Sequence, residues 1–203
     1  MHKFNPEHTS MLISGERQEK MRPEALLSDA GLKKGDTFAD IGCGPGFFTF
    51  PGAGIVGPAG RVYALDTEVR MIRELEKRTP PENVAVMKSE ENKIPVEAGT
   101  VDFALLAYVL HEAEDKDRFL KEIKRILRPG AIFVVLDWKK KAEEQGPPVH
   151  ERLAEEDVAS MLRAAGFALI RAKEINESHY MVGSIRPKPP DKGNADKNQQ
   201  YPC

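Results

Sequence analysis

Short apolar runs alternate along the chain with segments whose apolar residues recur at three- and four-residue intervals. Five runs have the length and composition of strands: residues 37–41, 61–65, 83–87, 101–107 and 131–137. Three segments carry a helical stripe: residues 68–77, 117–127 and 155–165. This alternation predicts a parallel sheet with helices on both faces.

The last third of the chain departs from this alternation. Residues 167–174 and 180–185 read as two further strands, and the link between them is too short for a crossover, so they should pair antiparallel. Near the N-terminus, residues 23–30 read as a helix with Pro23 at its first position and Gly31 after its end. Pro129-Gly130 should end the helix over 117–127. The predicted fold is α/β: a Rossmann-like, doubly wound sheet of seven strands, mostly parallel, with a C-terminal antiparallel hairpin.

Three parts of the chain differ in composition. Residues 1–22 are amphipathic and are expected to cover a ligand cleft. Residues 23–186 carry the alternating pattern and form the domain. Residues 187–203 hold almost no apolar side chains, so ordering them would cost more entropy than burial returns. We expect this last part to be a disordered tail.

The overall balance of charge excludes several classes of protein. Among 203 residues, 30 Lys and Arg face 32 Asp and Glu, a net charge of −2 that argues against a nucleic-acid partner. The two cysteines, Cys43 and Cys203, form neither a disulfide framework nor a metal-ligand spacing, so no metal is expected. Apolar runs fall short of the ~20 residues a membrane helix needs, and the N-terminus lacks a signal peptide's apolar stretch. These features predict a cytoplasmic protein without a membrane partner.

The most informative segment is a glycine loop between the first strand and a helical segment at 47–56. Gly42, Gly44 and Gly46 allow tight turning and close approach of a ligand, at the carboxyl end of a strand. Phe47 stands where a dinucleotide fingerprint needs a small residue, and no Gly-Lys-Ser/Thr follows as in a P-loop. The loop therefore suits a ligand other than a phosphate. A tight turn without a ligand is the alternative.

Residues 40–46, read as Asp-x-Gly-x-Gly-x-Gly, resemble motif I of the class I S-adenosylmethionine-dependent methyltransferases. Further segments match that family in order: residues 62–66 with a terminal acid, Glu90 before Pro95, and residues 101–103, 127–130 and 164–167. The matches lie within residues 36–185, and the small type 11 enzymes, akin to those of quinone biosynthesis, are the most similar group.

The resemblance implies S-adenosylmethionine as cofactor and assigns its contacts. Asp40 would lie near the amino group of the methionine moiety, with Gly42, Gly44 and Gly46 packed against the cofactor. Asp66 would accept hydrogen bonds from both ribose hydroxyls. Glu90 would face the adenine amino group, with backbone contacts from Glu91 or Asn92. The Ala107 carbonyl would face the methionine amine. A helix N-cap is an alternative role for Asp66. A solvated acid is the alternative for Glu90.

The acceptor side carries fewer signals, because in-line methyl transfer requires mainly positioning and exclusion of water. His111 follows the fourth strand and is the candidate general base, with a structural histidine as the alternative. Asp137 and Trp138 follow the fifth strand, and Trp138 either walls the acceptor pocket or packs in the core.

The predicted function is methyl transfer from S-adenosylmethionine to a small-molecule acceptor by a monomer or homodimer. Two alternatives remain at this point: a cofactor-binding domain without transfer activity, and an NAD-dependent dehydrogenase. Phe47 and the closing hairpin argue against the dehydrogenase.

Overall fold

A computed structural model describes residues 12–189 of the chain. Its strands are β1 Thr37–Ile41, β2 Arg61–Asp66, β3 Val84–Lys88, β4 Val101–Ala107, β5 Leu127–Trp138, β6 Ala168–Glu174 and β7 His179–Ile185. Its helices are α2 Gly15–Met21, α3 Pro23–Ala30, α4 Thr49–Val56, α5 Val69–Lys77, α6 Lys116–Ile126 and α7 Glu155–Ala164, with a 3-10 turn, η2, at Leu110–Glu112.

The strands form one seven-stranded sheet in the order β3-β2-β1-β4-β5-β7-β6. The first five strands of that order are parallel, and β7 runs antiparallel to both of its neighbours. This confirms the predicted doubly wound sheet with a closing hairpin. The order reverses between β1 and β4, so their carboxyl ends flank the crevice where open α/β sheets bind ligands.

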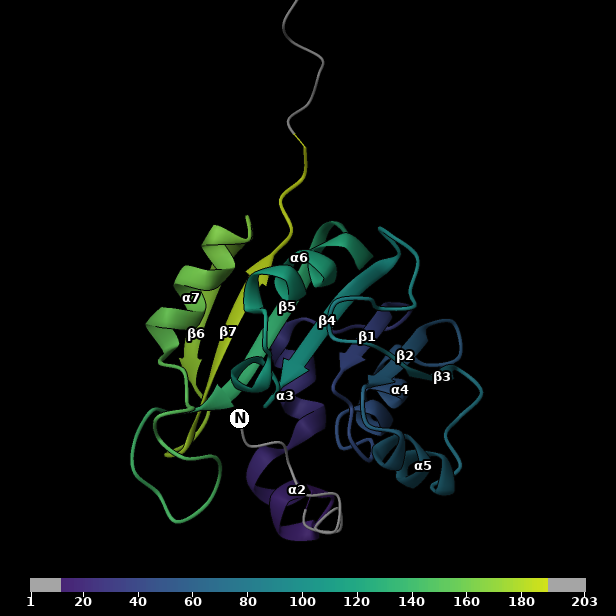
Figure 1. The fold of residues 1–203 in the computed structure, drawn as a ribbon. Coiled ribbons are helices and arrows are strands. Elements are labelled where there is room, and N and C mark those ends of the chain that lie inside the picture. The colour runs from purple at the N-terminus through teal and green to yellow at the C-terminus, as the bar shows by residue number, and fades with distance from the viewer. Residues whose placement is uncertain (1–11, 190–203) are drawn as a thin grey trace, which may run out of the picture.

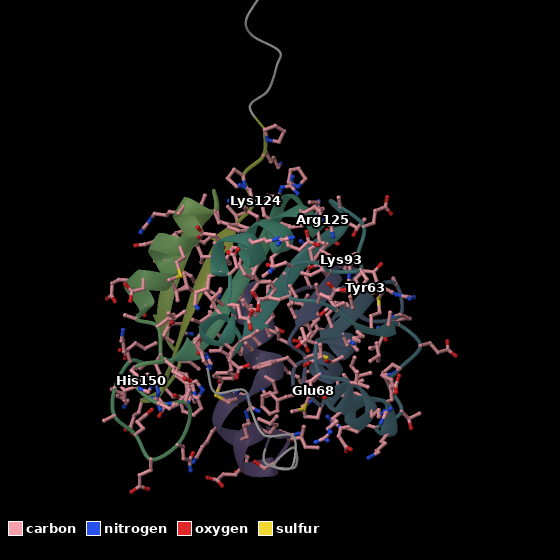
Figure 2. All side chains as sticks on the ribbon, in the orientation of Figure 1. Tyr63, Glu68, Lys93, Lys124, Arg125 and His150 are labelled. Carbon is pink, nitrogen blue, oxygen red and sulfur yellow. The ribbon has the colours of Figure 1, made fainter. Side chains whose placement is uncertain are left out.

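Two layers of helices bury the two faces of the sheet. On one face, Ala39, Leu106 and Val135 pack against the apolar stripes of α6 and α7. On the other face, Phe38 and Leu105 pack against α3 and α4. Figure 2 shows all the described side chains on the ribbon. Because the central strands are covered on both sides, they are almost continuously apolar.

Local sequence signals set several element ends, and those of α3 were predicted. Pro23 is at the first position of α3, and Gly31 ends it in the left-handed conformation. The side chain of Asp115 caps α6 by accepting the Arg118 N–H. Ala154 precedes α7 without a side-chain cap.

The predicted boundary between α6 and β5 is wrong, because Pro129 and Gly130, which were expected to end the helix, lie inside β5. The helix expected over 117–127 ends at Ile126, and β5 starts at Leu127 rather than at residue 131. Leu127 pairs with Val101 of β4, and Arg128 forms an ion pair with Asp102, so sheet pairing extends the strand backward. Pro129 is accommodated because the β4–β5 register shifts between Val101 and Phe103.

The two predicted terminal parts lie partly outside the described residues, at 1–11 and 190–203. Of the N-terminal part, the structure describes α2, which lies beyond the carboxyl ends of the central strands (Figure 1). Within residues 12–189, no helix is long and apolar enough to cross a membrane.

Candidate active site

The glycine loop is fixed to the neighbouring strand by its own backbone. The N–H groups of Gly42 and Cys43 both donate to the Leu65 carbonyl, at 2.7 and 3.0 Å. Gly42, Gly44 and Gly46 have φ of 71°, 52° and 91°, a region that favours glycine. The loop therefore leaves β1 in a shape that other residues would strain.

The three glycines serve different purposes. A Cβ on Gly42 would lie 2.3 Å from Cγ2 of Val109, and one on Gly46 would lie 2.7 Å from the Phe50 ring. At Gly44 the nearest atom, Cδ1 of Leu12, is 3.9 Å away. Two of the glycines are thus required by the packing of the protein itself, and Gly44 is the one with room for a ligand.

Asp40, at the carboxyl end of β1, is a buried acid with one hydroxyl partner. Its Oδ2 accepts a hydrogen bond of 2.6 Å from Oγ1 of Thr49 on α4. Burial raises the pKa of Asp40 to about 7; the Thr49 hydrogen bond opposes this rise, and the charge of Asp66 adds to it. A cation beside Asp40 would favour its ionised form, which suits an ammonium ligand.

Asp66, at the end of β2, holds the glycine loop from the side. Its Oδ2 accepts the Gly44 N–H and its Oδ1 accepts the Glu68 N–H, both at 2.8 Å. Burial raises the pKa of Asp66, while these backbone hydrogen bonds oppose the rise. The N-cap of α5 is Glu68, whose side chain accepts the Arg70 N–H, so the N-cap alternative for Asp66 is wrong.

The two acids that follow β3 contribute less to the candidate site than Asp40 and Asp66 do. The Glu90 side chain is exposed, and its backbone forms an isolated bridge with Lys93. Glu91 accepts the N–H groups of Glu114 and Asp115, each at 3.1 Å, and so fixes the start of α6. The structure therefore brings Asp40 and Asp66 together, while Glu90 faces solvent.

His111 and Asp137 form a buried pair at the carboxyl ends of β4 and β5. Nδ1 of His111 lies 2.8 Å from Oδ1 of Asp137, which also accepts the Trp138 N–H at 2.8 Å. Burial lowers the pKa of His111, but the hydrogen bond and charge of Asp137 outweigh it, so the net change is upward. Among the described residues, Oδ2 of Asp137 has no hydrogen-bond partner. The sequence named both residues as candidates but not their pairing.

An aromatic cluster lies beside this pair. The ring of His179 is 4.3 Å from Trp138 and 5.2 Å from Tyr108, centroid to centroid, and Tyr108 and Trp138 are 5.9 Å apart. Burial, followed by the charge of Arg17, lowers the pKa of His179 to about 4. His179 is therefore neutral at pH 7, and no pattern in the sequence singled it out.

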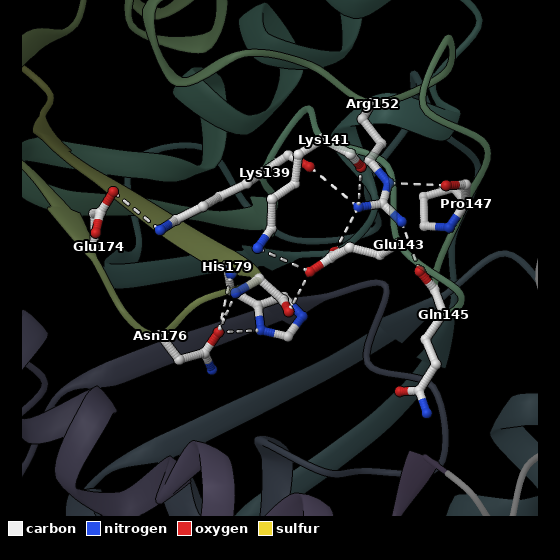
Figure 3. A network of polar contacts seen from close by, with 10 residues as sticks. Lys139, Lys141, Glu143, Gln145, Pro147, Arg152, Glu174, Asn176 and His179 are labelled. Atoms are coloured by element: carbon white, nitrogen blue, oxygen red, sulfur yellow. Dashed lines mark hydrogen bonds and ion pairs between the residues drawn. The ribbon is translucent and has the colours of Figure 1, made fainter.

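A single arginine organises the loop that joins β5 to α7 (Figure 3). Arg152 is 1% exposed, and its guanidinium lies 5.1 Å from the ring centroid of Trp138. It pairs with Glu143 at 2.7 Å, and Glu143 in turn accepts the Ser178 hydroxyl at 2.6 Å. The remaining donors of Arg152 meet backbone carbonyls of the same loop, those of Lys139, Lys141, Gln145 and Pro147. The loop is thus held against the aromatic cluster.

The strand order, the glycine loop and the two acids at the carboxyl ends of β1 and β2 define the class I S-adenosylmethionine-dependent methyltransferase fold. A family model described as a methyltransferase domain matches residues 39–135. A solved S-adenosylmethionine-dependent methyltransferase from Aquifex aeolicus is 36% identical, with a TM-score of 0.87 over 91% of this chain and 100% of that one. The chain therefore belongs to this family, whose cofactor is S-adenosylmethionine.

Two further matches agree with this assignment, and the first of them is described as type 11. A putative type 11 methyltransferase from Sulfolobus solfataricus is 25% identical, with a TM-score of 0.71 over 84% of this chain and 95% of that one. A demethylmenaquinone methyltransferase from Staphylococcus aureus is 31% identical over 121 residues, which are 59% of this chain and 50% of the relative. The chain thus spans about half the length of the curated relatives it matches. The dehydrogenase alternative is set aside by the family assignment.

Proposed function

We propose that this chain transfers the methyl group of S-adenosylmethionine to a small-molecule acceptor, and that His111 removes a proton from the acceptor. The observation that carries this proposal is the buried His111–Asp137 pair, at 2.8 Å, beside the crevice between β1 and β4. Val109, two residues before His111, packs against Gly42, which links the pair to the cofactor loop.

The cofactor site offers the groups that a nucleoside with an amino-acid arm requires. We propose that Asp66 meets the ribose hydroxyls, that Asp40 and the Ala107 carbonyl face the ammonium group, and that Gly44 leaves room for the arm. In the loop after β3, Oδ1 of Asn92 is buried without a partner among residues 12–189, and it can accept a donor such as the adenine amino group. Glu90 and Glu91 remain predicted contacts of the same loop.

The orientation of His111 fits the role of a base. With Asp137 accepting at Nδ1, that nitrogen carries the proton and Nε2 keeps its lone pair. S-adenosylmethionine supplies an electrophilic methyl carbon; as the acceptor atom bonds to it, the carbon–sulfur bond breaks. The proton of the acceptor passes to Nε2 of His111, and Asp137 stabilises the resulting imidazolium.

The surroundings of this pair favour a planar acceptor. Tyr108, Trp138 and His179 form an aromatic wall. A curated relative is named for demethylmenaquinone, so we propose a hydroxylated aromatic ring as acceptor. Near-balanced charge supports a small molecule over a nucleic acid, and we propose that a cytoplasmic monomer or homodimer carries out the reaction.

A turnover assay with His111 variants tests this function. Release of S-adenosylhomocysteine is measured with a panel of hydroxylated aromatic acceptors, for the unmodified chain, His111→Gln, Asp137→Asn and the control His150→Gln. His150 is exposed on the β5–α7 loop (Figure 2). We expect His111→Gln to lower turnover by about 10²–10⁴-fold with unchanged affinity for S-adenosylhomocysteine, and His150→Gln to have no effect.

The same assay separates the alternatives. Full turnover in His111→Gln would make His111 a structural histidine. Binding of S-adenosylhomocysteine without transfer to any acceptor would support a cofactor-binding domain instead.

A further inference from the structure

We propose that Arg17, on α2, receives the carboxylate of the cofactor's amino-acid arm. This inference rests on the proposed function and assigns a binding residue that lies outside the matched family segment, residues 39–135. It also gives α2 a specific role in covering the cofactor.

Arg17 lies where the two central strands end. Its guanidinium carbon is 4.3 Å from the ring centroid of Phe47 and 5.2 Å from that of Tyr108. Phe47 follows the glycine loop after β1, and Tyr108 is the first residue after β4. The guanidinium therefore spans the crevice at which the strand order reverses.

The guanidinium has donors left for a ligand. Its Nη1 donates to the Leu12 carbonyl at 2.7 Å, and Tyr108 is a second hydrogen-bond partner, which leaves part of its five donors for a ligand. The described part of the chain places no Asp or Glu at ion-pair distance from it. Arg152 shows the contrast, since its donors meet Glu143 and four carbonyls. A planar guanidinium can bind a carboxylate through two parallel hydrogen bonds.

The charge environment agrees with an anionic ligand at this point. Burial lowers the pKa of Arg17, while the neighbouring Tyr108 opposes the change. The positive charge of Arg17 also contributes to lowering the pKa of His179. Within residues 12–189 no carboxylate offsets the charge of Arg17, so an arriving carboxylate would stabilise its ionised form.

The order of groups across the crevice matches the shape of the cofactor. Asp66 at the end of β2 suits the ribose, Gly44 lies in the loop after β1, and Arg17 lies between Phe47 at the end of that loop and Tyr108 after β4. A zwitterionic arm that runs in this direction places its ammonium near Asp40 and its carboxylate near Arg17. Leu12 borders this path, because its Cδ1 lies 3.9 Å from the position of a Cβ on Gly44 and its carbonyl accepts Nη1 of Arg17.

Two residues next to α2 have a left-handed backbone, and contacts of Met21 fix the end of the helix. Arg22 ends α2 and begins α3 with φ of 43°, and Tyr108 has φ of 63°, both unusual for residues other than glycine. The hydroxyl of Tyr108 and Nδ2 of Asn176 lie 3.7 and 3.5 Å from Sδ of Met21, which is buried at the end of α2. Such strain is typical of functional sites.

Isothermal titration calorimetry with two nucleosides tests the proposal on the full chain. The probes are S-adenosylhomocysteine and its decarboxylated analogue, 5′-deoxy-5′-(3-aminopropylthio)adenosine, which keeps the amine and lacks the carboxylate. No acceptor is present, so an acceptor carboxylate cannot contribute. The variants are Arg17→Gln, Arg17→Lys and the control Lys20→Gln, whose parent side chain is exposed on the same helix and pairs with Glu16 at 2.7 Å.

We expect Arg17→Gln to weaken S-adenosylhomocysteine binding about 10- to 100-fold and to leave binding of the decarboxylated analogue unchanged. Arg17→Lys should fall between, and Lys20→Gln should match the unmodified chain. Equal losses for both nucleosides would overturn the proposal and make Arg17 a packing residue. Unchanged affinity for both would overturn it as well. If the unmodified chain binds neither nucleoside, the proposed function itself fails, which is a different result from either of these.

Discussion

The substitution Gly42→Ala tests whether the first glycine of the loop is required by packing rather than by a ligand. The new Cβ would lie 2.3 Å from Cγ2 of Val109 and 3.4 Å from its other two side-chain carbons. The left-handed backbone at φ 71° costs an alanine about 1–2 kcal/mol, and overpacking adds about 1–3 kcal/mol. We therefore expect a loss of about 2–5 kcal/mol in the free energy of unfolding, or roughly 5–15 °C in Tm.

Gly44→Ala is the matched comparison. Its φ of 52° carries the backbone cost, but no atom lies nearer than 3.9 Å, so we expect a loss of about 1–2 kcal/mol. Affinity for S-adenosylhomocysteine should show the opposite order, falling more in Gly44→Ala than in Gly42→Ala.

A double-mutant cycle with Val109→Ala isolates the steric part of the effect. Val109→Ala removes both methyl groups of Val109 and so relieves the overlap with the new Cβ. The double variant should therefore lose about 1–3 kcal/mol less free energy of unfolding than the sum of the two single losses. The assay is urea unfolding followed by circular dichroism and by fluorescence of Trp138, the one tryptophan of the chain. Additive losses, or a Gly42→Ala variant as stable as the unmodified chain, would refute the packing argument.

Three other substitutions test the acids and the loop. Asp66→Ala should weaken binding of S-adenosylhomocysteine about tenfold or more, as measured by calorimetry, because the proposed ribose contacts and the hydrogen bond to the Gly44 N–H are lost. Glu90→Ala, at an exposed side chain, should weaken this binding less. Asp40 keeps its proton in the folded state up to about pH 7 and loses it near pH 4 when unfolded, so stability falls as pH rises through this window. In urea titrations, the free energy of unfolding of the unmodified chain should fall by up to about 4 kcal/mol between pH 4 and pH 7, relative to that of Asp40→Asn. Arg152→Met leaves the carbonyls of the β5–α7 loop without their shared donor. Trypsin should then cleave after Lys140 or Lys141 at least about tenfold faster. The control Arg163→Met, on the exposed side of α7, should not change the rate of cleavage.

Sequence patterns predicted the elements whose signals are local. Pro23 and Gly31 mark both ends of α3, and the short link before β7 fixes an antiparallel hairpin. The start of β5 could not be predicted in this way. Leu127 fits the helical stripe of α6, and only its pairing with Val101, 26 positions earlier, places it in the sheet.

The candidate site shows the same division. Asp40 and Asp66 are assigned through the resemblance to the methyltransferase family, and the structure brings the two carboxyl groups near one another. The partnership of His111 with Asp137 joins two strand ends that are adjacent only once β4 pairs with β5. Arg17 and His179 carry no local signal, because their environment arises from the packing of α2 and the final hairpin against the crevice.

The two histidines of the site differ in their fitness as a base because opposite charges face them. Asp137 favours the protonated form of His111, whereas burial and Arg17 hold His179 neutral well below pH 7. At neutral pH, proton uptake in this region therefore falls to His111, and turnover should rise with pH through a single ionisation above the usual range of histidine. Asp137→Asn removes the largest of the charges that raise the pKa of His111, while burial and the smaller contributions of Glu112 and Glu151 remain, so the inflection should move to lower pH. A profile that stays in place would show that a group other than His111 controls the reaction.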